Sequence, residues 1–478
     1  MFILAYPVDP AFLANPLVQL AQVNPKFQQM HDLLQAVWAD ARVRLALRHD
    51  LAPPTKRAAQ LGAPAVPAQV TLNLAVVRRL MSWSYRTEAN EVDGSAGWRW
   101  VGGLSQQPMP NFRTLQEREA KLTPKTLRLI HTVVVQLGQR LGVTTAQKLR
   151  VDGSVTEMNI HYPTDSSLLD DSARVLSRLV RQARDLVRPR TRADKAWFRD
   201  RHRQAHHRAC DISRLARQKG KNTGKSGPKL YGQLLAVVEA LVAQVADIQP
   251  RLAGLSDLAA TGLNEMFDHY LPLVRQVISQ TRQRVLEGLS VPASDKVVSL
   301  FEPHTAIICR GKAKPKDTEF GRKLWYGEVD GGLISEYRIL VGNPDEAQFF
   351  LPSLQHHRQM FGKPPKHVSG DRGIHSAHNE QEARAFGVRW VSLPQPGHKT
   401  QRRRRQEKQP WFRAAQRFRN GIEGRISQLR RARRLDRCLN HGELGLERWV
   451  GWGVIANNLA TMALFLIKRQ RSVAAALG

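Results

Sequence analysis

Cysteine is scarce in this chain of 478 residues. Its three cysteines, Cys210, Cys309 and Cys438, lie far apart in the sequence. An odd number of widely spaced cysteines provides neither a disulfide framework nor a cysteine-rich zinc site, and it is typical of a reducing compartment. The first residues also lack the positive flank and long apolar segment of a signal peptide. We therefore expect a cytoplasmic protein.

Long hydrophobic runs without charge are rare as well. Residues 449–467 carry no charge and approach the length of a membrane span. The run contains Asn457, Asn458 and Thr461, which are polar. We interpret it as a buried helix and expect no membrane partner.

Acidic residues are few relative to basic ones. The chain has 41 Asp and Glu against 73 Lys and Arg, a net charge of +32. A chain this basic repels itself unless a polyanion is near, and nucleic acid is the commonest polyanion in a cell. Residues 174–229 carry a net charge of +14 and residues 399–437 carry +12, which is +26 of the total. Two discrete basic segments favour a DNA-binding enzyme over a uniformly basic scaffold.

The N-terminal part of the chain has helical apolar spacing. The spacing predicts helices within residues 11–50, 70–86 and 110–142, with a linker at 52–67 and a turn-rich joint at 90–103. Thr123 followed by Pro124 predicts a helix start. Residues 1–115 are thus expected to form an all-helical DNA-binding domain, although a helical packing or dimerisation domain fits the pattern nearly as well.

The periodicity changes at residues 147–160, where alternation predicts a strand or hairpin with Gly153 at a turn or bulge. Helical spacing returns over residues 165–288. Strands are then predicted at 296–310 and 324–342, with a tight turn at Asp330-Gly331-Gly332. Short strands at 367–369 and 388–393 alternate with helices at 345–360 and 376–386, and two helices follow.

These patterns predict an α/β protein with a long helical insertion. We expect residues 116–165 to hold a linking helix and the first part of the catalytic domain, and residues 166–295 to form a basic helical insertion. Residues 296–470 are expected to complete the catalytic domain, with C-terminal helices.

Three carboxylates stand in positions suited to metal binding. Asp152 lies in the first predicted strand, Asp371 follows a short strand, and Glu423 lies in a predicted helix at 412–435. Such acids around a cleft suit two Mg²⁺ ions, with Mn²⁺ as a substitute. Ions about 4 Å apart would activate a water or a 3′-hydroxyl and stabilise the leaving oxygen in phosphoryl transfer.

The segments around these acids, residues 151–154, 369–373 and 419–424 with Ser427, Leu429, Arg430 and Arg431, resemble the Asp-Asp-Glu (DDE) transposases of bacterial insertion sequences. The resemblance covers most of the chain, including residues 16–100, 161–166 and 301–305. It implies an RNase H-like catalytic domain in which Asp152, Asp371 and Glu423 hold the metal. It also implies recognition of terminal inverted repeats and target DNA by a nucleoid-associated homodimer or higher oligomer.

In related elements the glutamate belongs to a Tyr-x2-Arg-x3-Glu-x6-Lys pattern. Arg419 matches the arginine, Gln416 stands at the tyrosine position and Arg430 at the lysine position. An arginine still binds phosphate, and it does so bidentately.

Basic residues near the glutamate and in the insertion are the expected DNA contacts. They are Arg402, Arg403, Arg404, Arg405, Arg419, Arg425, Arg430, Arg431, Lys221 and Lys225. We interpret residues 402–405 as a disordered loop or one that DNA orders. The glycines of residues 220–226 are one residue too close for a Walker A motif, so we expect a flexible basic loop there. His206, His207 and Cys210 are potential metal ligands, but they lack a partner pair and we do not expect zinc.

The sequence therefore predicts a transposase that cleaves element ends and transfers strands. Two alternatives stay open: a catalytically inactive DNA-binding relative, and an RNase H-like nuclease unconnected with transposition.

Overall fold

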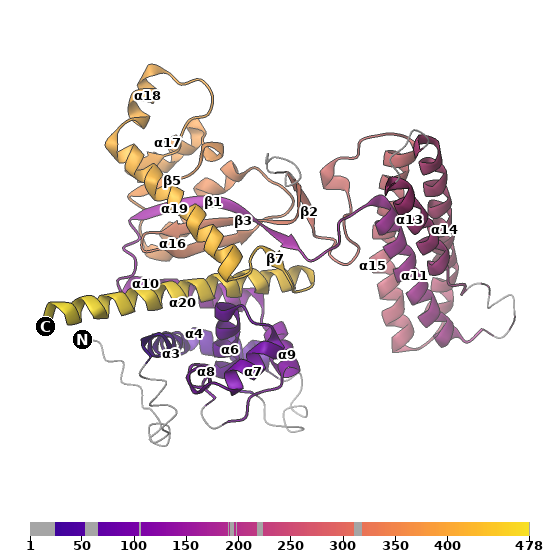
Figure 1. Ribbon diagram of the computed structural model, residues 1–478, viewed down its shortest axis with the longest axis horizontal. Helices are drawn as coiled ribbons and strands as arrows, with labels where there is room; N and C mark the ends of the chain where they lie inside the picture. The colour runs from indigo at the N-terminus through magenta and orange to yellow at the C-terminus, as the bar shows by residue number, and fades with distance from the viewer. Residues whose placement is uncertain are drawn as a thin grey trace. The chain divides into compact units, whose positions relative to one another are not determined.

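The fold is taken from a computed structural model, which describes residues 24–52, 66–104, 107–189, 191, 196, 198–217, 223–309 and 318–477. These residues form a mostly helical α/β protein with a mixed sheet of seven strands, which confirms the predicted class. The chain divides into two compact units, residues 1–157 with 323–478 and residues 158–322 (Figure 1). Each unit has its own hydrophobic core.

The first unit begins with helices. They are α3 (Pro25–Trp38), α4 (Ala41–Leu51), α6 (Ala68–Met81), α7 (Tyr85–Asp93), α8 (Ala96–Gly102), α9 (Phe112–Lys121) and α10 (Pro124–Arg140). Thr123 caps α10 and Pro124 opens it, as predicted. The joint expected at 90–103 is wrong: Ser84 and Ser95 cap α7 and α8 through their hydroxyls, so this segment is helical.

The C-terminal part supplies five more helices. They are α16 (Phe350–Phe361), α17 (Ala377–Ala385), α18 (Gln401–Glu407), α19 (Pro410–Ala432) and α20 (Gly442–Leu477). The loop expected at residues 402–405 is instead the helix α18, because the Thr400 hydroxyl caps it and the guanidinium of Arg403 is held by internal acids.

Helix α20 is the predicted apolar helix, and it packs against α3, α6, α10 and strand β4 (Leu333–Ile339) (Figure 1). Among the residues that the structure describes, two helical segments are long and apolar enough to cross a membrane, Gly227–Ala253 and Gly442–Ala476. In the second, 72% of the apolar window is buried inside the protein. Such burial is typical of a core helix.

The sheet lies in the order β2-β3-β1-β5-β6, with β4 also paired to β3 and β7 to β1. The remaining strands are β1 (Lys148–Met158), β2 (Ala306–Cys309), β3 (Thr318–Val329), β5 (His367–Ser369), β6 (Trp390–Ser392) and β7 (Arg437–Cys438). β1, β5 and β6 run parallel, and the β3–β4 and β2–β3 pairs are antiparallel. The strand expected at 296–310 is confined to β2, and β1 is one continuous strand with no turn at Gly153.

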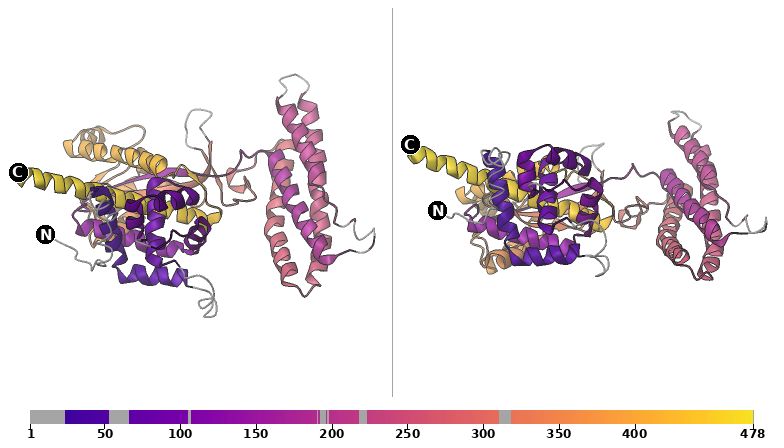
Figure 2. Two further views of the ribbon diagram at one scale, coloured as in Figure 1. Left: turned by 60° about the horizontal axis from the view of Figure 1, so that its bottom comes forward. Right: turned by 90° about the horizontal axis from the view of Figure 1, so that it is seen from below.

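The second unit holds the predicted helical insertion. Its helices are α11 (Asp165–Val187), α13 (His202–Arg217), α14 (Thr223–Ala253) and α15 (Leu258–Thr281). Figure 2 shows them as a bundle, and the buried side chains of all four form one core. This unit extends to Arg322 and so includes β2.

The predicted turn at Asp330-Gly331-Gly332 joins β3 to β4 and also anchors the start of β1. The Asp330 carboxylate accepts hydrogen bonds from the backbone N–H groups of Thr145 (2.7 Å) and Lys148 (3.0 Å). These bonds lower the pKa of Asp330 despite its partial burial. Gly331 has a φ of 84°, and a Cβ there would overlap the backbone carbonyl of Val143.

Replacing Gly331 with alanine tests this contact. Gly342 is the matched control, because its φ is 68° and nothing lies within 4 Å of a Cβ built there. We expect Gly342→Ala to lower the free energy of unfolding by about 1–2 kcal/mol, the penalty of left-handed backbone. Gly331→Ala should cost at least about 2 kcal/mol more, because backbone must move. Equal losses in urea unfolding would contradict the close approach to Val143.

Candidate active site

The register of the two parallel strands β1 and β5 brings Asp152 and Asp371 together. Arg150 of β1 pairs with Ser369 of β5. Each aspartate lies two residues beyond its member of this pair, so the two acids stand at matching levels of neighbouring parallel strands. Asp371 follows the end of β5, where its carboxylate accepts a hydrogen bond from the backbone N–H of Ile374 (3.1 Å).

Asp152 is the buried acid of the site, with 9% of its surface exposed. Burial raises its pKa from an ordinary 3.8 to about 6, and the negative charges of Asp371 and Glu346 add to the rise. Arg419 and the backbone N–H of Gly153 oppose it. A cation bound next to this carboxylate would therefore stabilise its ionised form.

Arg419 joins Asp152 to the third predicted acid. Its guanidinium lies 3.0 Å from Oδ2 of Asp152 and 2.9 Å from Oε1 of Glu423, which is one helical turn further along α19. The Glu423 side chain is 67% exposed, whereas that of Arg419 is 14% exposed. The structure thus brings all three predicted acids to one end of the sheet, with Arg419 between two of them.

Glu346 is a fourth acid at this site, and it was not among the residues predicted from the sequence. It opens the turn of 3-10 helix Glu346–Phe349, and its carboxylate lies over Gly153, where a Cβ would overlap it. Lys323 pairs with it at 3.0 Å. Gly153 was the available signal, since a glycine inside a strand often marks a close approach, but the sequence does not reveal what approaches.

Two sets of contacts fix α19 against the sheet, one to β6 and one to β1. Gln416 donates hydrogen bonds to the carbonyl and hydroxyl oxygens of Ser392, both at 2.9 Å. The Arg150 guanidinium donates to the carbonyl of Phe418 and would overlap a Cβ on Gly421. Gln416, at the tyrosine position of the transposase pattern, therefore ties the helix to β6.

The predicted DNA-contacting cations fall into two groups. Arg425 pairs with buried Glu328 at 3.3 Å, and Arg403 pairs with Glu380 at 2.7 Å and Glu407 at 2.9 Å. Arg403 and Arg425 therefore stabilise the fold through internal ion pairs. The exposed cations are Arg402, Arg404, Arg405 and Arg431, while Arg430 is half-buried. Lys221 lies outside the described residues, and Lys225 is described only through the backbone of α14.

The donor set at Asp152 and Asp371 suits a hard divalent cation, because both side chains supply carboxylate oxygens and the negative charge of Asp371 adds to the burial that raises the pKa of Asp152. Glu423 is linked to Asp152 through Arg419, which pairs with both carboxylates. Among the described residues the three acids are not packed within 4.8 Å of one another. Asp152 and Asp371 are therefore the residues that fit a metal, and Glu423 fits one when its pair with Arg419 opens.

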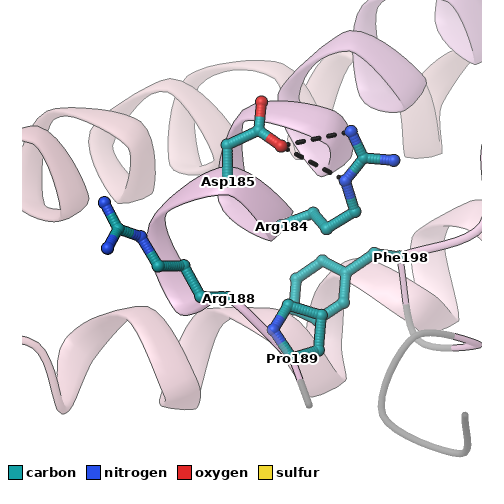
Figure 3. Close-up of a pocket in the computed structure, with 5 residues that line it drawn as sticks. All are labelled: Arg184, Asp185, Arg188, Pro189 and Phe198. Atoms are coloured by element: carbon teal, nitrogen blue, oxygen red, sulfur yellow. Dashed lines mark hydrogen bonds and ion pairs between the residues drawn. The ribbon is translucent and has the colours of Figure 1, made fainter. Parts of the chain in front are cut away.

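The second unit offers a basic hollow of about 510 Å³ at the end of α11. Figure 3 shows Arg184, whose guanidinium pairs with Asp185 (3.1 Å), and Arg188 on the far side of that carboxylate. Pro189 and Phe198 complete the lining. Its arginines belong to the first basic segment, and nothing in it resembles the paired acids of the first unit.

Comparison with known proteins gives no match for this chain: no family model, no curated protein and no solved structure is significantly similar to it. Its function has to be argued from the site.

The raised pKa of Asp152 predicts a pH-dependent stability difference. A carboxyl with a folded pKa of about 6 and an ordinary value of 3.8 favours folding most below pH 4. That contribution is lost as pH rises to about 6, a cost of about 2–3 kcal/mol. We expect Asp152→Asn to be more stable than the wild type at pH 7.5 in EDTA, with a gain about 1 kcal/mol larger than at pH 5.

Thermal unfolding at the two pH values measures this gain. The control is Asp436→Asn, since Asp436 is exposed and its carboxylate has no charged partner in the described residues. If the stability difference between Asp152→Asn and the wild type is the same at pH 5 and pH 7.5, the pKa of Asp152 is not raised in the folded protein.

Proposed function

We propose that this protein is a DDE transposase that cleaves DNA at element ends and transfers the strands to target DNA. The observation that carries the proposal is the matched position of Asp152 and Asp371 on neighbouring parallel strands, with Arg419 linking Asp152 to Glu423. These acids are far apart in the sequence, and the pairing of β1 with β5 and the contacts of Arg419 bring them to one part of the first unit.

The sheet supports an RNase H-like catalytic domain. An antiparallel hairpin, β3–β4, adjoins β1, and two strands parallel to β1 follow on its other side. This is the arrangement expected of that fold, with one aspartate on the central strand, one after the next strand and the glutamate on a later helix.

The acids and Arg419 would have different roles at such a site. Bound divalent cations would activate the attacking oxygen and neutralise charge at the phosphate. Asp152 and Asp371 would hold them, because both supply carboxylate oxygens and Asp152 is ionised above its pKa of about 6. Arg419 would turn its guanidinium to the DNA phosphate, which it can also bind bidentately, and so free Glu423 to join the two aspartates.

Replacing Asp371 tests the catalytic assignment. We expect Asp371→Asn and Glu423→Gln to lower the rate of Mg²⁺-dependent cleavage by about 10³-fold, the effect of losing several kcal/mol of metal stabilisation. The substrate is a supercoiled plasmid that carries the DNA flanking this reading frame. Asp436→Asn and Glu382→Gln, both exposed and outside the site, should cleave as the wild type does.

The products separate the proposal from its alternatives. Cleaved ends joined to target DNA support a transposase. Cleavage without joining indicates a nuclease, and binding without cleavage indicates an inactive relative; either result contradicts the proposal.

The exposed arginines of α18 should set part of the salt dependence of DNA binding. Each phosphate contact contributes about 0.9 to the slope of log K against log salt concentration. We expect the triple alanine variant of Arg402, Arg404 and Arg405 to lower that slope by about 2–3. The matched control removes Lys468, Arg469 and Arg471, which are exposed at the end of α20 and lie outside both basic segments. Equal slopes for the two triple variants would exclude α18 from the DNA interface.

A further inference from the structure

A second group of metal-ligating side chains lies in the inserted unit, where the sequence analysis did not expect zinc. Asp170 of α11 faces His202 and His206 of α13, and one potential ligand atom from each lies within 4.8 Å of the other two. It is the one such group of three or more in the part of the chain that the structure describes.

Helix periodicity explains how α13 presents these side chains. His202 and His206 are four residues apart and so share a face. Ala205, Ala209 and Ile212 form the neighbouring buried stripe of the same helix. Packing that stripe into the core of the unit leaves the two histidines at its margin, beside α11, with small alanines that allow close approach.

The distances between ligand atoms suit a small transition-metal ion. Nδ1 of His206 lies 2.9 Å from Oδ2 of Asp170, and Nε2 of His202 lies 3.7 Å from Oδ1 of Asp170. Tetrahedral zinc with bonds of about 2.0–2.1 Å places its ligands about 3.3 Å apart. Small adjustments of these side chains would reach that spacing.

Two further observations point to a ligand. Oδ1 of Asp170 is buried and accepts no hydrogen bond, which is costly for a carboxylate oxygen. Nε2 of His206 lies 3.6 Å from Sγ of Cys210. A histidine that binds metal through one ring nitrogen uses the other for such a supporting contact, which fixes the ring.

We propose that Asp170, His202 and His206 bind one Zn²⁺ ion, with water in the fourth position and Cys210 orienting His206. Imidazole and carboxylate donors select zinc over Mg²⁺, which prefers oxygen ligands alone. The ion would clamp α13 to α11 and so hold the basic face of the insertion rigid. The site is separate from the three acids of the proposed catalytic centre.

Zinc titration against a chromophoric chelator tests this site. The parent is the full chain with Asp152→Asn and Asp371→Asn, so that the catalytic acids do not bind the probe. We expect about one zinc ion per chain in the parent and none in the same chain with His202→Ala or His206→Ala. The matched control is His207→Ala, which removes the exposed neighbouring imidazole of the same helix and should keep the ion.

The proposal fails if the parent binds no zinc, or if His202→Ala and His206→Ala bind it as His207→Ala does. Circular dichroism verifies that each variant keeps its helices. If an alanine variant loses its helices, Asp170→Asn takes its place, because asparagine preserves the size of the side chain and removes the charge of the carboxylate ligand. DNA cleavage by the otherwise unmodified chain is measured separately, so loss of zinc and loss of catalysis are distinguishable.

Discussion

A buried ion network centred on Glu328 supports the arrangement of the proposed catalytic site. Glu328, in β3, is completely buried and pairs with Arg150 of β1 at 2.6 Å and with Arg425 of α19 at 3.3 Å. Arg150 also stacks on Phe418. The network therefore fixes the strand that carries Asp152 and the helix that carries Glu423 to the same residue. Replacing one member of such a network leaves a buried charge without a partner, which typically lowers the free energy of unfolding by about 3–5 kcal/mol.

The basic character of the chain thus has two structural uses. Arg150, Arg403 and Arg425 neutralise internal acids and hold elements in place, while the arginines at 402, 404 and 405 face solvent. Arg419 belongs with the first group, because it pairs with both Asp152 and Glu423. Net charge alone does not separate these uses, since it counts every arginine equally.

Local signals in the sequence predicted the elements well. The change of period at β1, the Thr-Pro start of α10 and the Asp-Gly-Gly turn were all correct, because each depends on neighbours in the sequence. Some of what failed depended on distant partners. Gly153 is not a turn residue but leaves room for Glu346, and Arg403 of α18 pairs with Glu380 of α17 as well as with Glu407 of its own helix.

The sites show the same division. The strand and helix contexts of Asp152, Asp371 and Glu423 were visible in the sequence, and the structure places the three together. Glu346 and Asp170 were not visible, because each is brought to its partners by tertiary packing across many residues. The resemblance to DDE transposases supplied the expected chemistry, and the register of β1 with β5 sets Asp152 and Asp371 at matching levels.

The place of the insertion in the chain has a consequence for how such a protein arises. The chain leaves the sheet at the end of β1 and returns to it in β2, which pairs with β3, the neighbour of β1. The helices between β1 and β2 have their own core, and the pairing of β1 with β5 and of β5 with β6 does not involve them. Since the entropy of closing a loop grows only slowly with its length, such a connection tolerates the gain or exchange of a whole domain. The bundle can therefore change while the pairing of β1 with β5 stays the same.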